Sequence, residues 1–75
     1  MVARMLFNKA YVLFYDGNYL ESEILVSKAL QLLKKSDDSK LIFTCYNLIG
    51  TNFEKLEEYN ESLKYYILAK EFHNY

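Results

Sequence analysis

Residues 46–66 read YNLIGTNFEKLEEYNESLKYY, and 40 positions earlier residues 6–26 read LFNKAYVLFYDGNYLESEILV. Some pairs at this spacing are identical: Tyr19 and Tyr59, Glu21 and Glu61, Ser22 and Ser62, Ala29 and Ala69. Others agree in kind: Leu6 and Tyr46, Ala10 and Gly50, Leu13 and Phe53, Val26 and Tyr66. Self-similarity at a fixed period of this length predicts a repeat architecture. The function of such a protein lies in the surface that the stacked units present.

The composition limits the class of protein. The 75 residues form one small domain, taken here as residues 1–75. A hydrophobic share of 52% excludes disorder, and a net charge of −1 argues against direct binding of nucleic acid. No apolar run is long enough to cross a membrane, and the lone Cys45 favours a reducing compartment. We therefore expect a cytoplasmic protein.

Hydrophobic periodicity predicts an all-α fold. The expected helices run from Ala3 to Tyr15, from Tyr19 to about Lys35, from about Lys40 to Lys55 or Leu56, and from Tyr59 to about Phe72. Short turns would join them into two antiparallel hairpins. Their expected buried stripes are Leu6, Ala10, Leu13 and Phe14; Leu20, Ile24, Ala29, Leu30 and Leu33, widened by Leu25, Val26 and Leu32; Ile42, Tyr46, Ile49 and Phe53; and Leu63, Tyr66, Ile67 and Ala69.

Turn residues separate these helices. Gly17 can adopt the left-handed conformation that ends a helix, and Asn18 can cap the next one. The polar run Ser36-Asp37-Asp38-Ser39 supplies further caps. Gly50 is expected in mid-helix, where glycine costs about 1 kcal/mol relative to alanine. A glycine at such a position is expected to let a neighbouring helix approach closely.

The spacing of small and large residues resembles the tetratricopeptide repeat, whose pattern is W-x2-L-G-x2-Y, then A-x3-F. The second half has Tyr46-x2-Ile49-Gly50-x2-Phe53, then Ser62-x3-Tyr66, then Ala69. The first half has Leu6-x2-Lys9-Ala10-x2-Leu13, then Ser22-x3-Val26, then Ala29. The resemblance implies two helix hairpins stacked as a short right-handed solenoid, with unit one at residues 3–35 and unit two at residues 39–74.

The chain departs from that pattern in three ways. Its period is 40 rather than about 34 residues, the closing proline is missing, and Lys9 replaces a large apolar residue. Without a proline the second helix can continue for about one more turn. Such lengthened repeats are similar to those of Gram-positive peptide-sensing (RRNPP-type, quorum-sensing) transcriptional regulators. In those proteins a helix-turn-helix precedes the repeats; no such motif occurs in these residues, so any DNA binding would belong to another segment.

Nothing in the sequence indicates an enzyme. The only histidine, His73, has no recognisable nucleophile as a partner, and we expect it to be an exposed surface residue. Cys45 is expected to be a buried hydrophobic residue. One histidine and one cysteine do not form a metal site, and no glycine-rich loop that could hold a phosphate is present, so we expect no cofactor.

A groove is the better candidate site. In the family that this chain resembles, the first helix of each unit lines the concave face. The positions carried over are Arg4, Phe7, Asn8, Tyr11, Phe14 and Tyr15, with Thr44, Asn47, Leu48, Thr51, Glu54 and Lys55. We take as peptide-binding candidates Arg4, Phe7, Asn8, Tyr11, Tyr15, Asn47, Thr51 and Lys55. Alternatively, these are ordinary exposed residues or contacts to a further repeat. The carboxylate clamp of co-chaperones is not expected, because its two first-unit positions hold Phe7 and Tyr11.

The small size of the chain bears on assembly. Two units are fewer than the three or so that stability normally requires. With eight tyrosines and five phenylalanines, the chain is expected either to be part of a longer solenoid or to form at least a dimer, through its open end faces or by exchange of a hairpin. Two functions follow: a non-catalytic module that binds a peptide or protein segment, or an assembly element that self-associates without a peptide.

Overall fold

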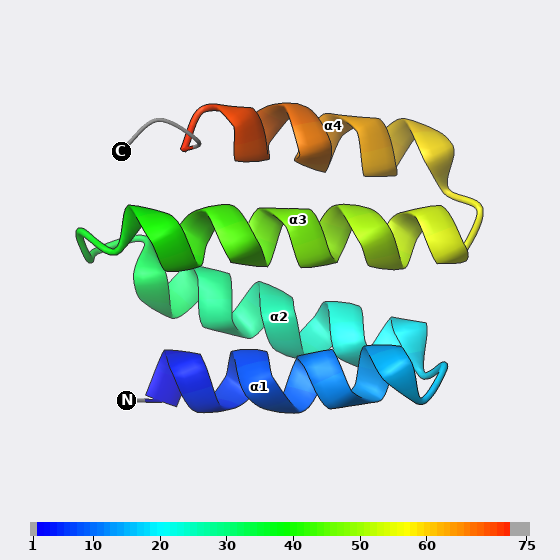
Figure 1. The fold of residues 1–75 in the computed structure, drawn as a ribbon, viewed down its shortest axis with the longest axis horizontal. Helices are drawn as coiled ribbons and strands as arrows, with labels where there is room; N and C mark the ends of the chain where they lie inside the picture. The colour runs from blue at the N-terminus through cyan, green and yellow to red at the C-terminus, as the bar shows by residue number, and fades with distance from the viewer. Residues whose placement is uncertain (1, 73–75) are drawn as a thin grey trace.

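The computed structural model describes residues 2–72, which form α1 (Val2–Tyr15), α2 (Tyr19–Leu33), α3 (Ser39–Lys55) and α4 (Tyr59–Lys70). The helices lie side by side in chain order, so that α1 and α4 form the two outer edges (Figure 1). Each helix packs on the next one along the chain. The all-α hairpin pair is therefore confirmed. Residues 73–74 of the expected second unit, and with them His73, lie outside the described residues.

The 40-residue period recurs in the backbone of the two hairpin turns. The Asn18 N–H donates to the Leu13 carbonyl at 2.8 Å, and the Glu58 N–H donates to the Phe53 carbonyl at 2.8 Å. These bonds close each hairpin's first helix with the same C-cap geometry. Gly17 has a φ of 85°, as expected, and the residue 40 positions later, Glu57, has a φ of 63°. The second turn thus places a side chain where the first has glycine.

A chain of buried hydrogen bonds joins three helices. The Ser22 hydroxyl of α2 donates to the Ala10 carbonyl of α1 at 2.7 Å, and the Asn52 amide of α3 donates to the Ser22 oxygen at 2.9 Å. All three residues are fully buried. Because a buried polar group is costly without a partner, this chain fixes how α3 sits on the first hairpin. The Asn52 Oδ1 atom has no partner among the described residues.

Gly50 lies where α3 and α4 approach each other closely, as expected. A Cβ atom built there would lie 3.0 Å from the Tyr66 ring and 3.3 Å from the Ser62 carbonyl oxygen. In the first unit the equivalent positions hold Ala10 and Val26, and both are fully buried. There the residue in the first helix is larger and the residue in the second helix smaller than in unit two, which pairs Gly50 with Tyr66.

The expected buried stripes are only partly correct. The expectations for Ala29, Leu30, Leu33, Ile42, Ile49 and Ala69 are confirmed, while Ala3 and Phe7 are further core residues. Four expected core residues are instead exposed, namely Leu20 (62%), Ile24 (46%), Leu63 (60%) and Ile67 (54%), and Leu32 is exposed as well. The reason is that helices in a single row are covered on fewer sides than the periodicity alone implies. On α2 the buried side is the one that carries Ser22, Val26, Ala29 and Leu33.

Two details of the helix ends also differ. α2 ends at Leu33, so the two following lysines lie beyond it. The Asn18 side chain makes no capping hydrogen bond, whereas Asp38 accepts one from the Leu41 N–H at 3.1 Å. Asn18 therefore stands at the N-cap position of α2, as expected, but does not cap the helix through its side chain. The cap from the polar run before α3 is confirmed.

Candidate functional site

A recess lies between the start of α1 and the start of α3. It is lined by Arg4, Phe7 and Asn8 from α1, and by Asp38, Lys40, Leu41 and Thr44 from α3 and the turn before it. Of the peptide-binding candidates, the recess brings together Arg4, Phe7 and Asn8 from unit one. From unit two it includes the carried-over position Thr44 but none of the candidates Asn47, Thr51 and Lys55. The repeat pattern missed Asp38, Lys40 and Leu41, because the positions carried over on the second groove helix began at Thr44, five residues after the start of α3.

The recess holds charges of both signs. The Arg4 guanidinium lies 3.9 Å from the Asp38 carboxylate, with both side chains partly exposed, so this ion pair adds little stability. Asp38 also caps α3. Lys40 is exposed, and within residues 2–72 its side chain has no acidic partner at ion-pair distance. Lys40 can thus donate a hydrogen bond to a ligand carbonyl or carboxylate in the recess while Arg4 and Asp38 remain paired with each other.

Aromatic rings continue along α1 from the recess. Phe7 and Tyr11 have ring centroids 5.8 Å apart, and Tyr11 and Tyr15 have theirs 5.0 Å apart. The hydroxyls of Tyr11 and Tyr15 lie 3.2 Å from each other, and this hydrogen bond raises the pKa of Tyr11. Both tyrosines are exposed, so they offer apolar area with a polar tip, although neither lines the recess.

A second polar cluster lies further along α3. The Thr51 hydroxyl lies 2.8 Å from the Asn47 carbonyl and 3.0 Å from the Tyr66 hydroxyl, which donates to Glu54 at 2.9 Å. Burial is the largest cause of the raised pKa of Tyr66. Tyr66 therefore reaches from α4 to Thr51 and Glu54 of α3, a role that its repeat position did not indicate. Lys55 is exposed at the end of the helix.

Two candidates carry amide groups without a partner. Asn8 is exposed and Asn47 is half-buried, and neither side chain forms a hydrogen bond to another residue in the described range 2–72. Each amide can donate to and accept from a peptide backbone. Two other carried-over positions are not open groove residues, since Phe7 (9% exposed) and Leu48 (6% exposed) belong to the core. Phe7 still lines the recess.

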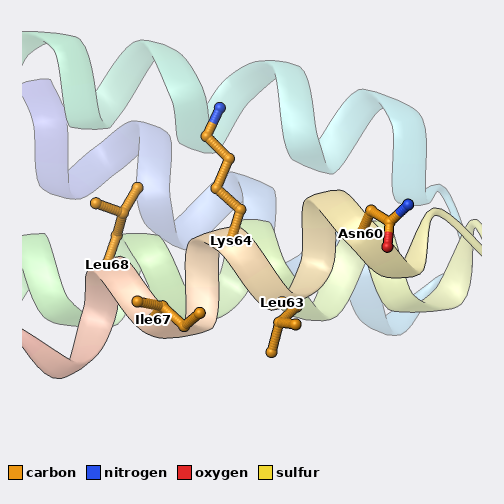
Figure 2. Close-up of a pocket in the computed structure, with 5 residues that line it drawn as sticks. All are labelled: Asn60, Leu63, Lys64, Ile67 and Leu68. Atoms are coloured by element: carbon orange, nitrogen blue, oxygen red, sulfur yellow. The ribbon is translucent and has the colours of Figure 1, made fainter.

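An apolar hollow that the groove comparison missed lies on α4. Its lining residues, Asn60, Leu63, Lys64, Ile67 and Leu68, all come from this one helix (Figure 2). It is therefore an open face of an edge helix rather than a cavity between elements. The sequence signal for it was the pair Leu63 and Ile67, which the periodicity assigned to the core.

The lone cysteine lies in the core rather than at the surface. Cys45 is fully buried, as expected, and burial, with a smaller effect of Asp38, raises the pKa of its thiol to about 12. Such a thiol is a poor nucleophile. Among residues 2–72 no cluster of acidic residues, histidine or cysteine could hold a metal ion, and no helix is long and apolar enough to cross a membrane.

Comparison with known proteins gives one match. The family model for the tetratricopeptide repeat matches residues 1–72. No curated protein and no solved structure matches the chain.

Proposed function

The chain belongs to the tetratricopeptide repeat family, whose helical repeats are typically non-catalytic protein-binding modules, and we propose that its α1–α3 groove binds an extended peptide segment. The observation that carries this proposal is the pair of unpartnered amides, Asn8 on α1 and Asn47 on α3. A peptide laid along the groove would present backbone N–H and C=O groups to them. Tyr11 and Tyr15 would cover its apolar side chains.

The test uses peptides selected by phage display against the immobilised chain. The affinity of a selected, fluorescently labelled peptide is then measured by anisotropy for the wild type, Asn8→Ala and Asn47→Ala. Each variant loses about one net hydrogen bond, about 1 kcal/mol, which corresponds to roughly fivefold weaker binding. The matched control is Asn60→Ala, because Asn60 is an exposed asparagine on α4, away from the groove.

Two results would contradict the groove proposal. One is the selection of no peptide at all. The other is binding that neither Asn8→Ala nor Asn47→Ala changes; if Asn60→Ala alone weakens it, the binding site lies on α4.

A narrower form of the proposal makes the chain the ligand-sensing part of a cytoplasmic quorum-sensing transcriptional regulator. Its support is the 40-residue period without a closing proline, together with the unpartnered groove amides. The single buried thiol of Cys45 fits a reducing compartment. A helix-turn-helix encoded directly upstream would support this form, and its absence there would remove the basis for it.

A second candidate function is assembly without a peptide. It is favoured by the large apolar side chains exposed on both edge helices, among them Val2, Met5 and Val12 on α1 and Leu63 and Ile67 on α4.

A further inference from the structure

The two repeat units stack on each other mainly through α2 and α3, with a smaller contact between α1 and α3. Asn52 of α3 donates to Ser22 of α2. Ile49 of α3 shares a pocket with Ser27, Leu30 and Gln31 of α2. Because the chain repeats every 40 residues, each half of this contact has a counterpart elsewhere in the molecule, and both counterparts lie on an edge helix.

The first counterpart lies on α1. Ile49 and Asn52 of α3 meet α2, and Ile42 and Cys45 lie on the same helical face at intervals of three and four residues; all four are buried. Shifted back by 40 positions, these become Val2, Met5, Lys9 and Val12, which we name the N-side face. Three of these are large apolar residues, and their exposed fractions are 63% for Val2, 68% for Met5 and 60% for Val12. α1 thus repeats the apolar side of α3 with nothing packed on it in the described chain.

The second counterpart lies on α4. Shifted forward by 40 positions, Ser27, Leu30 and Gln31 become Ile67, Lys70 and Glu71, and half-buried Glu23 becomes Leu63. We name Leu63, Ile67, Lys70 and Glu71 the C-side face. The side chains of Leu63 and Ile67 line the open hollow on the exposed face of α4 (Figure 2). The polar position Ser27 of the internal contact has therefore become apolar at the edge, as has Glu23 one helical turn before it, although nothing in the described chain covers the apolar counterparts.

We propose that the C-side face of one chain binds the N-side face of a second copy, so that the second copy stacks as a further unit would. Each face is one half of a contact that the molecule already forms internally, and a second copy supplies the missing half of each. Such a contact joins two different surfaces, so copies add head to tail rather than around a two-fold axis.

The charges agree with this orientation. In the internal contact Ile49 and Gln31 line the same pocket; in the stack their counterparts would be Lys9 of one copy and Glu71 of the other, which carry opposite charges. Lys70 stands where the internal contact has buried Leu30, so the contact between copies is more polar than the internal one. We therefore expect association that is reversible and weakened by salt.

The experiment uses two variants that each disable one face. Met5→Glu places a carboxylate on the N-side face, and Ile67→Glu places one on the C-side face. Both residues are exposed in the single chain, so both variants should fold, which circular dichroism checks. Leu20→Glu is the matched control, because Leu20 is as exposed (62%) but lies beside the α1–α2 turn, off both faces. Sedimentation equilibrium is measured for each chain alone and for an equimolar mixture of the two face variants.

Head-to-tail stacking predicts a distinctive result. The wild type and Leu20→Glu associate as the concentration rises, whereas Met5→Glu and Ile67→Glu are each monomeric alone. Mixed together they form a dimer that does not grow further, because the one intact N-side face meets the one intact C-side face. The proposal is overturned if the wild type is monomeric, if either face variant still self-associates, if their mixture stays monomeric, or if Leu20→Glu is also monomeric. Self-association of both face variants would instead indicate hairpin exchange.

Discussion

Replacing Gly50 by alanine tests the close contact between α3 and α4. The new Cβ atom would lie 3.0 Å from two carbons of the Tyr66 ring and 3.3 Å from the Ser62 carbonyl oxygen. The ring does not move freely, because its hydroxyl bonds to both Thr51 and Glu54. In the first unit the same place holds Ala10 against Val26, so an alanine fits when the residue across from it is smaller.

The magnitude follows from two opposing effects. Alanine is about 1 kcal/mol better than glycine in a helix interior. Overpacking a well-filled contact costs about 1–3 kcal/mol. Gly50→Ala should therefore lower the free energy of unfolding by about 1 kcal/mol in the wild type. In a Tyr66→Val background the clash with the ring is absent and only the 3.3 Å approach to the Ser62 carbonyl oxygen remains, so the same change should raise the free energy of unfolding by up to about 1 kcal/mol. The coupling between the two positions is then up to about 2 kcal/mol, within the usual range for residues in contact.

Urea denaturation followed by circular dichroism measures all four proteins of the cycle. A difference of 1 kcal/mol moves the melting temperature by about 4–8 °C in a domain of this size, so thermal melts provide a second readout. Tyr66→Val also loses the hydrogen bonds of the tyrosine hydroxyl, but both proteins in the Tyr66→Val background lack these bonds, so the loss cancels from the coupling energy. The close contact would be refuted if Gly50→Ala stabilised both backgrounds by the same amount.

Two further predictions concern the turns and the buried hydrogen bonds. Glu57→Gly should raise the free energy of unfolding by about 1 kcal/mol, because glycine adopts a φ of 63° without the steric cost that other residues have. Gly17→Ala, at the equivalent turn, should lower the free energy of unfolding by a similar amount. If urea denaturation showed that both variants change the free energy of unfolding in the same direction, this reasoning would be contradicted. Ser22→Ala should lower the free energy of unfolding by about 2 kcal/mol, since the buried Asn52 amide loses its acceptor. Ser62→Ala, one repeat later, should lower the free energy of unfolding by less, because no asparagine side chain within residues 2–72 donates to Ser62. An equal loss of stability in Ser22→Ala and Ser62→Ala would be evidence against the role of Asn52.

The sequence by itself determined the repeat. Small residues at Ala10, Gly50, Ser22 and Ser62 recur because the two helices of each hairpin approach closely at the same points, and that requirement is local enough to be read from spacing. Gly17 likewise predicted the left-handed turn, since few other residues adopt that conformation readily. The expected helix boundaries lie close to the observed ones, because capping and turn residues affect the backbone only within a few positions along the chain.

Only the tertiary structure decided which apolar residues are covered. Leu63 and Ile67 have the same hydrophobicity and helical spacing as core residues, yet they are exposed because α4 is an edge helix with a neighbour on one side. Phe7 was assigned to the groove from its repeat position, but most of its side chain is buried in the core and only a small part of it faces the recess. Periodicity states that a helix has an apolar face; burial depends on whether another element is present to pack against it.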